Sequence, residues 1–260
     1  MRVDGDRLIW PGGELIRLHD GAIRFGSDFI PDGRGRPVPD EITLPVQAYL
    51  LRRPGTAPVL IDTGCGNLDG PGCGHLAAVL AARGIAAGEI GDVLFTHLHS
   101  DHCGGFRGLA LDRARLHIAA AEAAHWAGRD HSAARLLSDY AGRISCFADG
   151  DVVVPGITAW ALPGHMPGHT GFVIDGQVAV VGDMLHRADL QLADPRIATR
   201  FDVDPAQASD TRIAGLARIA ERGLVFCSGH GRLPGQEDGP GGCPFLRIAG
   251  DGTGWRARMP

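Results

Sequence analysis

Short apolar runs recur along the chain and predict buried strands. Each run is rich in Val, Ile, Leu or Phe and is bounded by polar or turn-forming residues. The runs cover residues 59–61, 93–95, 157–162, 172–174, 178–181 and 224–226. Asp175 and Gly176 separate two of these runs, and an Asp-Gly pair in that position predicts a tight hairpin.

Helical patterns lie between the predicted strands. Residues 75–84 form one such pattern, which ends at a glycine. Residues 204–223 form another, with Asp204 placed as the N-cap, Pro205 at the first helical position and a stop at Gly223. Ile213, Leu216 and Ile219 share one predicted face of that helix. Strands and helices mixed along the whole chain predict one α/β domain over residues 1–260.

Two segments are expected to lie outside the layered core. Residues 31–41 are rich in Pro, Gly and charged residues and predict an exposed loop rather than a domain boundary. Residues 244–260 predict a C-terminal hairpin.

Composition narrows the class of protein. Hydrophobic residues make up 44% of the chain and charged residues 21%, which is typical of a globular protein with a full core. The net charge of −5 gives no basis for nucleic-acid binding, and the absence of Lys excludes a Schiff-base mechanism.

No apolar run is long enough to span a membrane, and the N-terminus lacks the pattern of a secretory signal, so a cytoplasmic protein with no membrane partner is expected. Six scattered cysteines without a C-x-x-C pair are expected to be reduced thiols.

The stretch "THLHSDHCGG" at residues 96–105 carries the strongest chemical signal. It places His97, His99, Asp101 and His102 within six positions, in a chain with 12 His in all. Imidazole and carboxylate groups are the ligands that divalent transition metals prefer. The alternative is a polar loop in a histidine-rich chain, which such dense spacing disfavours.

Further polar residues follow predicted strands. Asp62, His97, Asp183 and His230 each come where an apolar run gives way to a loop, and His169 directly precedes one. Each could cap its own strand end. Because five occur together beside the dense cluster, convergence at one edge of a sheet is the favoured interpretation.

Together these positions supply seven nitrogen and oxygen donors. The donors are His97, His99, Asp101, His102, His169, Asp183 and His230. A single zinc ion takes four ligands, so seven donors predict two ions that share Asp183 and hold a bridging hydroxide. Zinc is the expected metal, and manganese, cobalt or iron would accept the same donors.

The motifs "LIDTG", "THLHSDHCGG", "LPGHMPGHT", "VVGD" and "SGH" resemble those of the metallo-β-lactamase fold. They occur in that superfamily's order and cover about residues 44–231. The resemblance implies an αββα sandwich, with two mixed sheets flanked by helices. It also implies one metal held by His97, His99 and His169, a second held by Asp101, His102 and His230, and Asp183 as the bridge.

Roles for other residues follow from the same resemblance. In "GHMPGH" the second histidine is expected to be the ligand, so His165 is expected to play a structural role beside the site. Asp62 of the "DTG" turn is expected to orient metal ligands. A metal-bound hydroxide would attack a carbonyl or phosphorus, and Asp101 or His186 would pass a proton to the leaving group.

Within the superfamily, two branches are the most similar. His186 stands where quorum-quenching lactonases commonly carry Tyr. Residues 182–208 and the closing "FLRIAGDGTGWRARM" hairpin resemble the methyl-parathion-hydrolase-like group, which implies a homodimer. The predicted activity is hydrolysis of a lactone or activated ester of a small apolar molecule. Alternatives are a phosphotriester hydrolase, a glyoxalase-II-type thioesterase, a mononuclear iron persulfide dioxygenase and a degenerate metal-binding module.

The substrate pocket is the least specified feature. Phe106 and Leu185 lie within a few residues of predicted ligands and are expected to contact substrate. Other aromatic residues beside loops are expected to belong to the core. These are Trp10, Phe25, Phe29 and Trp126.

Overall fold

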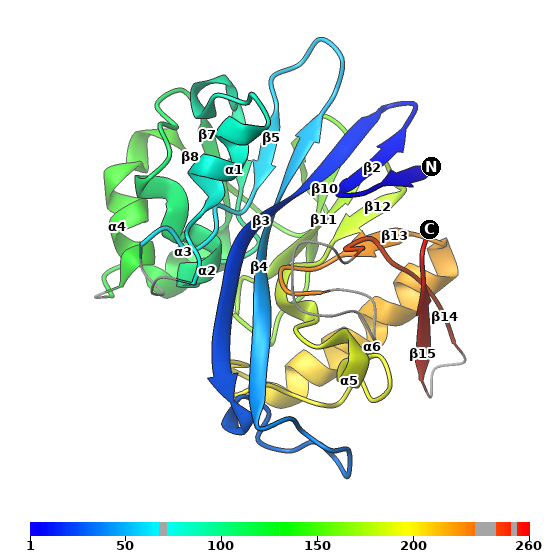
Figure 1. The fold of residues 1–260 in the computed structure, drawn as a ribbon. Helices are drawn as coiled ribbons and strands as arrows, with labels where there is room; N and C mark the ends of the chain where they lie inside the picture. The colour runs from blue at the N-terminus through cyan, green and yellow to red at the C-terminus, as the bar shows by residue number, and fades with distance from the viewer. Residues whose placement is uncertain (68–71, 130, 232–242, 251–253) are drawn as a thin grey trace.

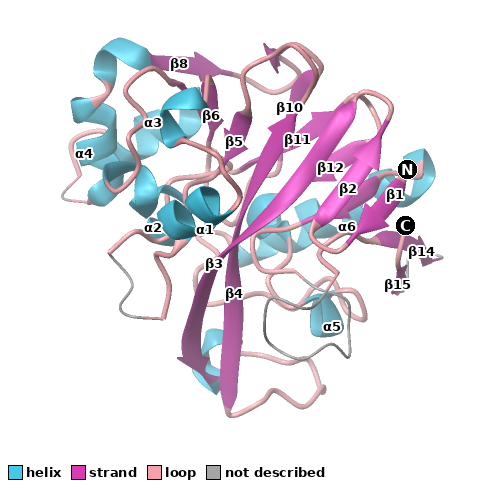
Figure 2. Cartoon of the chain, turned by 45° about the horizontal axis from the view of Figure 1, so that its top comes forward, coloured by secondary structure: helices cyan, strands magenta, loops and turns pink. Residues whose placement is uncertain are grey.

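Two β-sheets pack face to face, and helices cover both outer faces (Figures 1 and 2). The computed structural model describes residues 1–67, 72–129, 131–231, 243–250 and 254–260. This arrangement confirms the predicted αββα sandwich. The number of domains stays a prediction.

The first sheet contains eight strands in chain order. They are β1 (Arg2–Asp4), β2 (Arg7–Trp10), β3 (Gly13–Gly26), β4 (Glu41–Arg52), β5 (Val59–Ile61), β6 (Asp92–Leu94), β7 (Arg115–Ala119) and β8 (Ile144–Phe147). Strands β1 to β5 pair antiparallel, and β5 to β8 pair parallel. The long β3–β4 ribbon crosses the molecule (Figure 1).

The second sheet contains five strands in the order β13-β12-β11-β10-β9. They are β9 (Val152–Val154), β10 (Ile157–Ala161), β11 (Thr170–Ile174), β12 (Val178–Val180) and β13 (Val225–Cys227). Only the β12–β13 pair is parallel. Near the C-terminus, β14 (Arg247–Gly250) and β15 (Trp255–Arg258) form a separate antiparallel pair.

Short helices connect the strands. On the side of the first sheet lie α1 (Leu76–Ala82), α2 (Ser100–Cys103), α3 (Ala120–Trp126) and α4 (Ser132–Asp139), and on the side of the second lie α5 (Ala188–Gln191) and α6 (Pro205–Arg222) (Figure 2). The 3-10 turns are η1 (Ser27–Phe29), η2 (Ala87–Glu89), η3 (Gly104–Arg107), η4 (Ala141–Arg143) and η5 (Gly182–Met184). None of the helices in the described part of the chain is both long and apolar enough to cross a bilayer.

Alternating side chains of the first sheet enter two different cores. Leu50 and Leu60 pack with the helices on the outer face. Tyr49, Leu51 and Ile61 point the other way and pack against the second sheet. Burial on both faces explains why the central strands are continuous apolar runs in the sequence.

The predicted local elements are present, with one exception in side-chain orientation. Asp175 and Gly176 both have positive φ, 51° and 67°, and turn β11 into β12 as the Asp-Gly pair predicted. The Asp204 side chain accepts a hydrogen bond from the N–H of Gln207 and caps α6. Ile213 is exposed rather than on the buried face, because Arg212 occupies that face.

Residues 31–41 connect η1 to β4 and are largely exposed. Residues 251–253 of the predicted C-terminal hairpin lie outside the described residues.

Candidate metal centre

The candidate ligands lie where strands of both sheets end. His97 and His99 follow β6, and the next turn, α2, presents Asp101 and His102. Asp183 follows β12 within η5, and further ligands follow β10 and β13. The edge common to these strand ends therefore gathers side chains that are far apart in the sequence.

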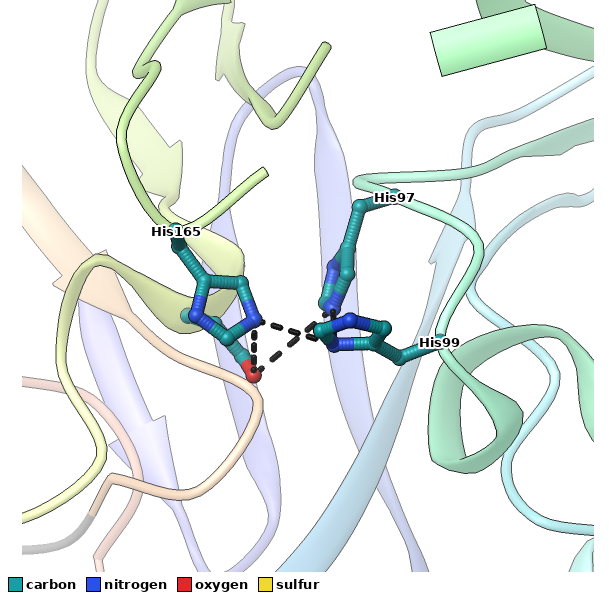
Figure 3. Close-up of side chains that lie close together, drawn as sticks. His97, His99 and His165 are labelled. Carbon is teal, nitrogen blue, oxygen red and sulfur yellow. Dashed lines mark hydrogen bonds and ion pairs between the residues drawn. The ribbon is translucent and has the colours of Figure 1, made fainter. Parts of the chain in front are cut away.

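One group of four donors can hold a single ion. It consists of His97, His99, His165 and Asp183, whose ligand atoms all lie within 4.8 Å of one another. Nδ1 of His99 lies 3.0 Å from Nε2 of His97 and 3.1 Å from Nε2 of His165. The three rings converge in Figure 3. With Zn–N bonds of about 2.0–2.1 Å, tetrahedral ligands lie about 3.3 Å apart, close to these distances.

A second group lies directly beside the first. It consists of Asp101, His102 and His230. Nε2 of His230 lies 3.3 Å from Oδ2 of Asp101 and 3.4 Å from Oδ2 of Asp183. Nε2 of His102 lies 3.1 Å from Oδ1 of Asp183. The Asp183 carboxylate thus lies between the two groups: Oδ1 faces His102, and Oδ2 lies 3.4 Å from Nε2 of both His165 and His230.

Two buried polar atoms at this place have no hydrogen-bond partner among the described residues. They are Nε2 of His102 and Oδ1 of Asp183. Buried polar atoms are almost always satisfied, so two atoms that lie 3.1 Å apart without hydrogen-bond geometry indicate a position for a further partner. A divalent cation fits both, and the mixture of imidazole and carboxylate suits zinc, manganese, cobalt or iron.

The ionisation of the two groups also suits cations. Burial lowers the pKa of His97 well below its usual range and that of His99 to about 3, so both imidazoles are neutral. Burial alone would raise the pKa of Asp183, but the imidazoles of His102 and His230 hold it well below its usual range. The carboxylates in turn overcome burial and raise the pKa of His230 to about 10. Protons therefore occupy positions that a metal ion would take.

The structure places the two histidines of "GHMPGH" differently from the expected assignment. Nδ1 of His169 donates to the carbonyl oxygen of Leu162 at 2.8 Å, and its Nε2 accepts from the backbone N–H of Asp183 at 2.9 Å. Both nitrogens of His169 are therefore engaged. His165, which was expected beside the site, directs Nε2 into the first ligand group instead.

Asp62, which the sequence predicted to orient metal ligands, contacts one of the candidate ligands. It sits at φ 61° and accepts hydrogen bonds from the N–H and the hydroxyl of Thr96, both at 2.8 Å. Its Oδ2 also lies 2.9 Å from Nδ1 of His102. Because a carboxylate only accepts, Nδ1 of His102 carries the proton and Nε2 is left to face the ligand group.

Two glycines permit the close approach of the ligand loops. Gly182 has φ 48°, and a Cβ there would lie 2.6 Å from Nε2 of His169. A Cβ at Gly229 would lie 2.7 Å from Cε1 of His102 and 2.8 Å from Oδ1 of Asp183. A side chain at Gly229 would displace candidate ligands, and one at Gly182 would displace His169, which explains the glycines in "VVGD" and "SGH".

A cavity of about 380 Å³ opens onto both ligand groups. Its polar lining includes His99, Asp101, His165, Asp183, His186 and His230. Its apolar wall is made by Ile23, Phe25, Phe29, Leu44, Trp126 and Phe201. None of the described residues that line it is Arg, and the chain has no Lys.

The residues that line the cavity do not include the two predicted substrate contacts. Phe106 is buried among the helices of the first sheet, and Leu185 is buried against the second sheet. Neither lines the cavity, although both neighbour candidate ligands in the sequence. Phe25, Phe29 and Trp126, expected in the core, pack in or against core clusters and also line the cavity. Trp10 does belong to the core between the sheets.

Two wall residues had no clear signal in the sequence. Phe201 lies in the irregular segment before α6. Its aromatic side chain is exposed, which is the one feature that sets it apart. His131 stacks on Trp126 with ring centroids 4.2 Å apart and an interplanar angle of 22°. Both belong to segments far from the ligand motifs.

The two predicted proton carriers both reach the cavity. Nε2 of His186 lies 3.0 Å from Oδ2 of Asp183, and its ring stacks on His230 at 5.4 Å. The Asp101 side chain is 17% exposed, more than the other carboxylate at the site. Either group is placed next to a substrate that enters the cavity.

Residues 42–230 match the metallo-β-lactamase superfamily. This match covers most of the chain and contains every candidate ligand. The chain belongs to the metallo-β-lactamase superfamily.

Individual relatives are similar over different extents. A hydroxyacylglutathione hydrolase from Fuscovulum blasticum is 30% identical over 172 residues, which make up 65% of this chain and 58% of that protein. The chain therefore spans less than two thirds of that relative's length. Among solved structures, the hydrolase AbOPH of the β-lactamase superfamily has a TM-score of 0.82 at 22% identity, over 100% of this chain and 99% of that one.

The chain is similar to the same degree to AidC, a dizinc quorum-quenching lactonase solved in complex with a product, N-hexanoyl-L-homoserine. Its TM-score is 0.83 at 19% identity, over 98% of this chain and 96% of that one. At such low identities, the two solved structures show that the fold is shared.

Proposed function

We propose that the protein is a dinuclear metal-dependent hydrolase that opens a lactone or cleaves an activated ester of a small, largely apolar molecule. One observation carries this proposal: two donor groups that both contact Asp183 open onto a cavity of about 380 Å³ with an aromatic wall. Membership of the superfamily and the hydroxyacylglutathione hydrolase relative support metal-dependent hydrolysis.

The chain would hold the two ions through separate sets of side chains. His97, His99 and His165 would bind one ion, Asp101, His102 and His230 the other, and Asp183 both. When bound, a pair of divalent ions lowers the pKa of water and withdraws charge from a carbonyl or phosphoryl oxygen.

The protein's own groups would supply orientation and proton transfer. Phe25, Phe29 and Phe201 form one apolar wall, with ring centroids 5.0 to 5.9 Å apart, and would hold the apolar part of a substrate away from water. Asp101 and His186 face the same cavity from the polar side. Asp101, an ionised carboxylate, would take a proton from the attacking water and pass it to the departing oxygen, or His186 would donate that proton from Nε2.

The volume and the lining of the cavity also support a small, largely apolar substrate. Its volume lies near the lower end of the range of about 300–1,000 Å³ typical of small-molecule sites. An uncharged acyl or aryl group matches its apolar wall. The structural similarity to a lactonase, AidC, is consistent with such a substrate.

A thioesterase of hydroxyacylglutathione type is the second candidate, favoured by the 30% identical relative. Glutathione carries two carboxylates, which a binding site commonly neutralises with basic side chains. None of the described residues that line the cavity is Arg. We therefore expect glutathione thioesters to be poorer substrates than uncharged lactones.

The test compares initial rates of zinc-, manganese- and cobalt-loaded protein on four substrates. These are a long-chain acyl-homoserine lactone, a simple aryl ester, methyl parathion and a glutathione thioester. Faster opening of the lactone or cleavage of the ester supports the proposal. A preference for methyl parathion would indicate a phosphotriesterase, and a preference for the thioester would indicate the second candidate.

Failure on all four substrates with two ions bound would contradict the proposed substrate class. One iron per chain with oxygen consumption on a persulfide would instead indicate a dioxygenase. The homodimer and the cytoplasmic location remain proposals, and sedimentation equilibrium of the full chain tests the first.

A further inference from the structure

A buried carboxylate lies directly behind His165. Oδ1 of Asp202 is 3.0 Å from Nδ1 of His165, and Oδ2 accepts a hydrogen bond from the N–H of Thr199 at 2.9 Å. The Asp202 side chain is completely buried. Because an ionised carboxylate only accepts, Nδ1 of His165 donates to it and Nε2 keeps its lone pair.

That lone pair is directed at the first donor group. Nε2 of His165 lies 3.1 Å from Nδ1 of His99 and 3.4 Å from Oδ2 of Asp183. The ring is therefore fixed from one side by Asp202 and presents a ligand atom on the other.

A buried arginine lies in turn behind Asp202. Nη2 of Arg212 is 3.7 Å from Oδ2 of Asp202, and both side chains are at most 1% exposed. Nε of Arg212 donates to the carbonyl oxygen of Met184, the residue after Asp183, at 2.7 Å. Nη1 donates to the carbonyl oxygens of Pro195 and Ile197. The two opposite charges compensate each other where water is excluded, and Arg212 links Asp202 to the backbone beside Asp183.

The backbone reinforces this connection. The N–H of Val203 donates to the carbonyl oxygen of His165 at 3.1 Å, and the N–H of Asp204 donates to that of Gly164 at 2.9 Å. The segment that leads into α6 is thereby paired with the turn that carries His165. Movement of Asp202 relative to His165 is restricted by these bonds as well.

We propose that Asp202, held in place by Arg212, is a positioning residue that fixes the tautomer and orientation of His165 and thereby sets the affinity of one metal position separately from the other. The inference rests on the proposed function, in that it requires two ions to bind. Asp62 has the equivalent contact with His102 in the second group. The two positions therefore have independent supports.

Titration of the metal-free protein with zinc against a chromophoric chelator tests this inference. The wild type should bind two equivalents. Asp202→Asn should weaken one equivalent by about 10- to 100-fold, the usual effect of losing a carboxylate behind a ligating histidine, and leave the other unchanged. Asp210→Asn, on the exposed side of α6, is the matched control and should bind like the wild type.

A second variant shows which position Asp202 supports. In a His165→Ala background, Asp202→Asn should add no further loss of zinc affinity, whereas Asp62→Asn should still weaken the remaining ion. Additive losses from His165→Ala and Asp202→Asn, equal weakening of both ions, or unchanged affinity in Asp202→Asn would overturn the inference. A wild type that binds no zinc would instead overturn the proposed function and the inference with it.

A measurement on the wild type covers the case in which Asp202→Asn does not fold. In proton NMR spectra of the zinc-loaded protein, the Nδ1 proton of His165 should give a slowly exchanging downfield resonance that disappears in His165→Gln. Absence of that resonance would show that Asp202 does not receive a proton from Nδ1, and would overturn the inference.

Discussion

The backbone N–H of Asp183 donates a hydrogen bond to Nε2 of His169 at 2.9 Å. This bond uses the nitrogen that would otherwise bind a metal, since Nδ1 of His169 already donates to Leu162. His169 therefore fixes the backbone at the carboxylate shared by the two donor groups. His165, four residues earlier, faces the donor groups instead.

The two histidines should respond differently to replacement. His165→Ala removes a ligand, so we expect one of the two metal ions to be lost, with a fall in kcat/KM. His169→Ala leaves the Asp183 N–H and the Leu162 carbonyl unsatisfied, and should lower the free energy of unfolding by about 1–3 kcal/mol while both ions still bind. Metal analysis and chemical denaturation of both variants measure these effects. Loss of an ion in His169→Ala but not in His165→Ala would contradict the assignment.

Substitution of Phe201 should affect substrate binding, whereas substitution of Phe106 should affect stability. Phe201 is 39% exposed at the cavity, so Phe201→Ala should raise KM for apolar substrates with little change in stability. Phe106 is 1% exposed in the core, so Phe106→Ala should cost about 3–5 kcal/mol of stability and leave KM unchanged in the folded fraction. Steady-state kinetics and denaturation of the same preparations give both quantities. The opposite pattern would mean that the cavity is not the substrate site.

Glu122 connects both ligand loops with the cavity wall. Its Oε1 accepts from the N–H of Leu98 at 2.9 Å and from the indole N–H of Trp126 at 2.8 Å, and its Oε2 accepts from the N–H of Gly168 at 3.2 Å. Glu122→Gln places an amide NH₂ against at least one of these donors, which should lower stability by about 1–3 kcal/mol.

Glu122→Gln should also raise KM, because the Trp126 side chain lines the cavity and would be held less firmly. Glu221→Gln, on the exposed side of α6, is the control and should change neither quantity. Denaturation curves and KM values that match the wild type in Glu122→Gln would show that these three bonds contribute little.

Metal removal should lower the thermal stability of the protein. Ions that bind only the folded state stabilise it by about 2.7 kcal/mol at a free concentration of 100 Kd. We therefore expect a lower Tm after dialysis against a chelator and recovery on addition of zinc. The recovery should be much smaller in Asp183→Asn, which lacks the shared carboxylate. An identical Tm with and without zinc in the wild type would argue against any ordered site.

The sequence predicted the parts of the site that depend on dense local spacing. His97, His99, Asp101 and His102 follow one strand within six residues, and the turn geometry of that short stretch leaves few arrangements other than convergence. The layered fold was equally predictable, because strands buried on both faces are continuous apolar runs.

The choice between His165 and His169 was not predictable from local sequence. It depends on a hydrogen bond from Asp183 and a carboxylate at Asp202, both distant along the chain. Proximity in sequence also misled the choice of Phe106, because η3 turns that side chain into the core. The cavity wall brings together residues from β3, α3 and the segment before α6, which the sequence shows as unrelated aromatic positions.

The most direct test of the account is the metal content per chain of the wild type and of Asp183→Asn, measured together with hydrolytic turnover. The account predicts two ions per chain and turnover in the wild type, with loss of at least one ion and of turnover in Asp183→Asn. Undiminished turnover in Asp183→Asn, or a wild type that turns over with no bound metal, would contradict it.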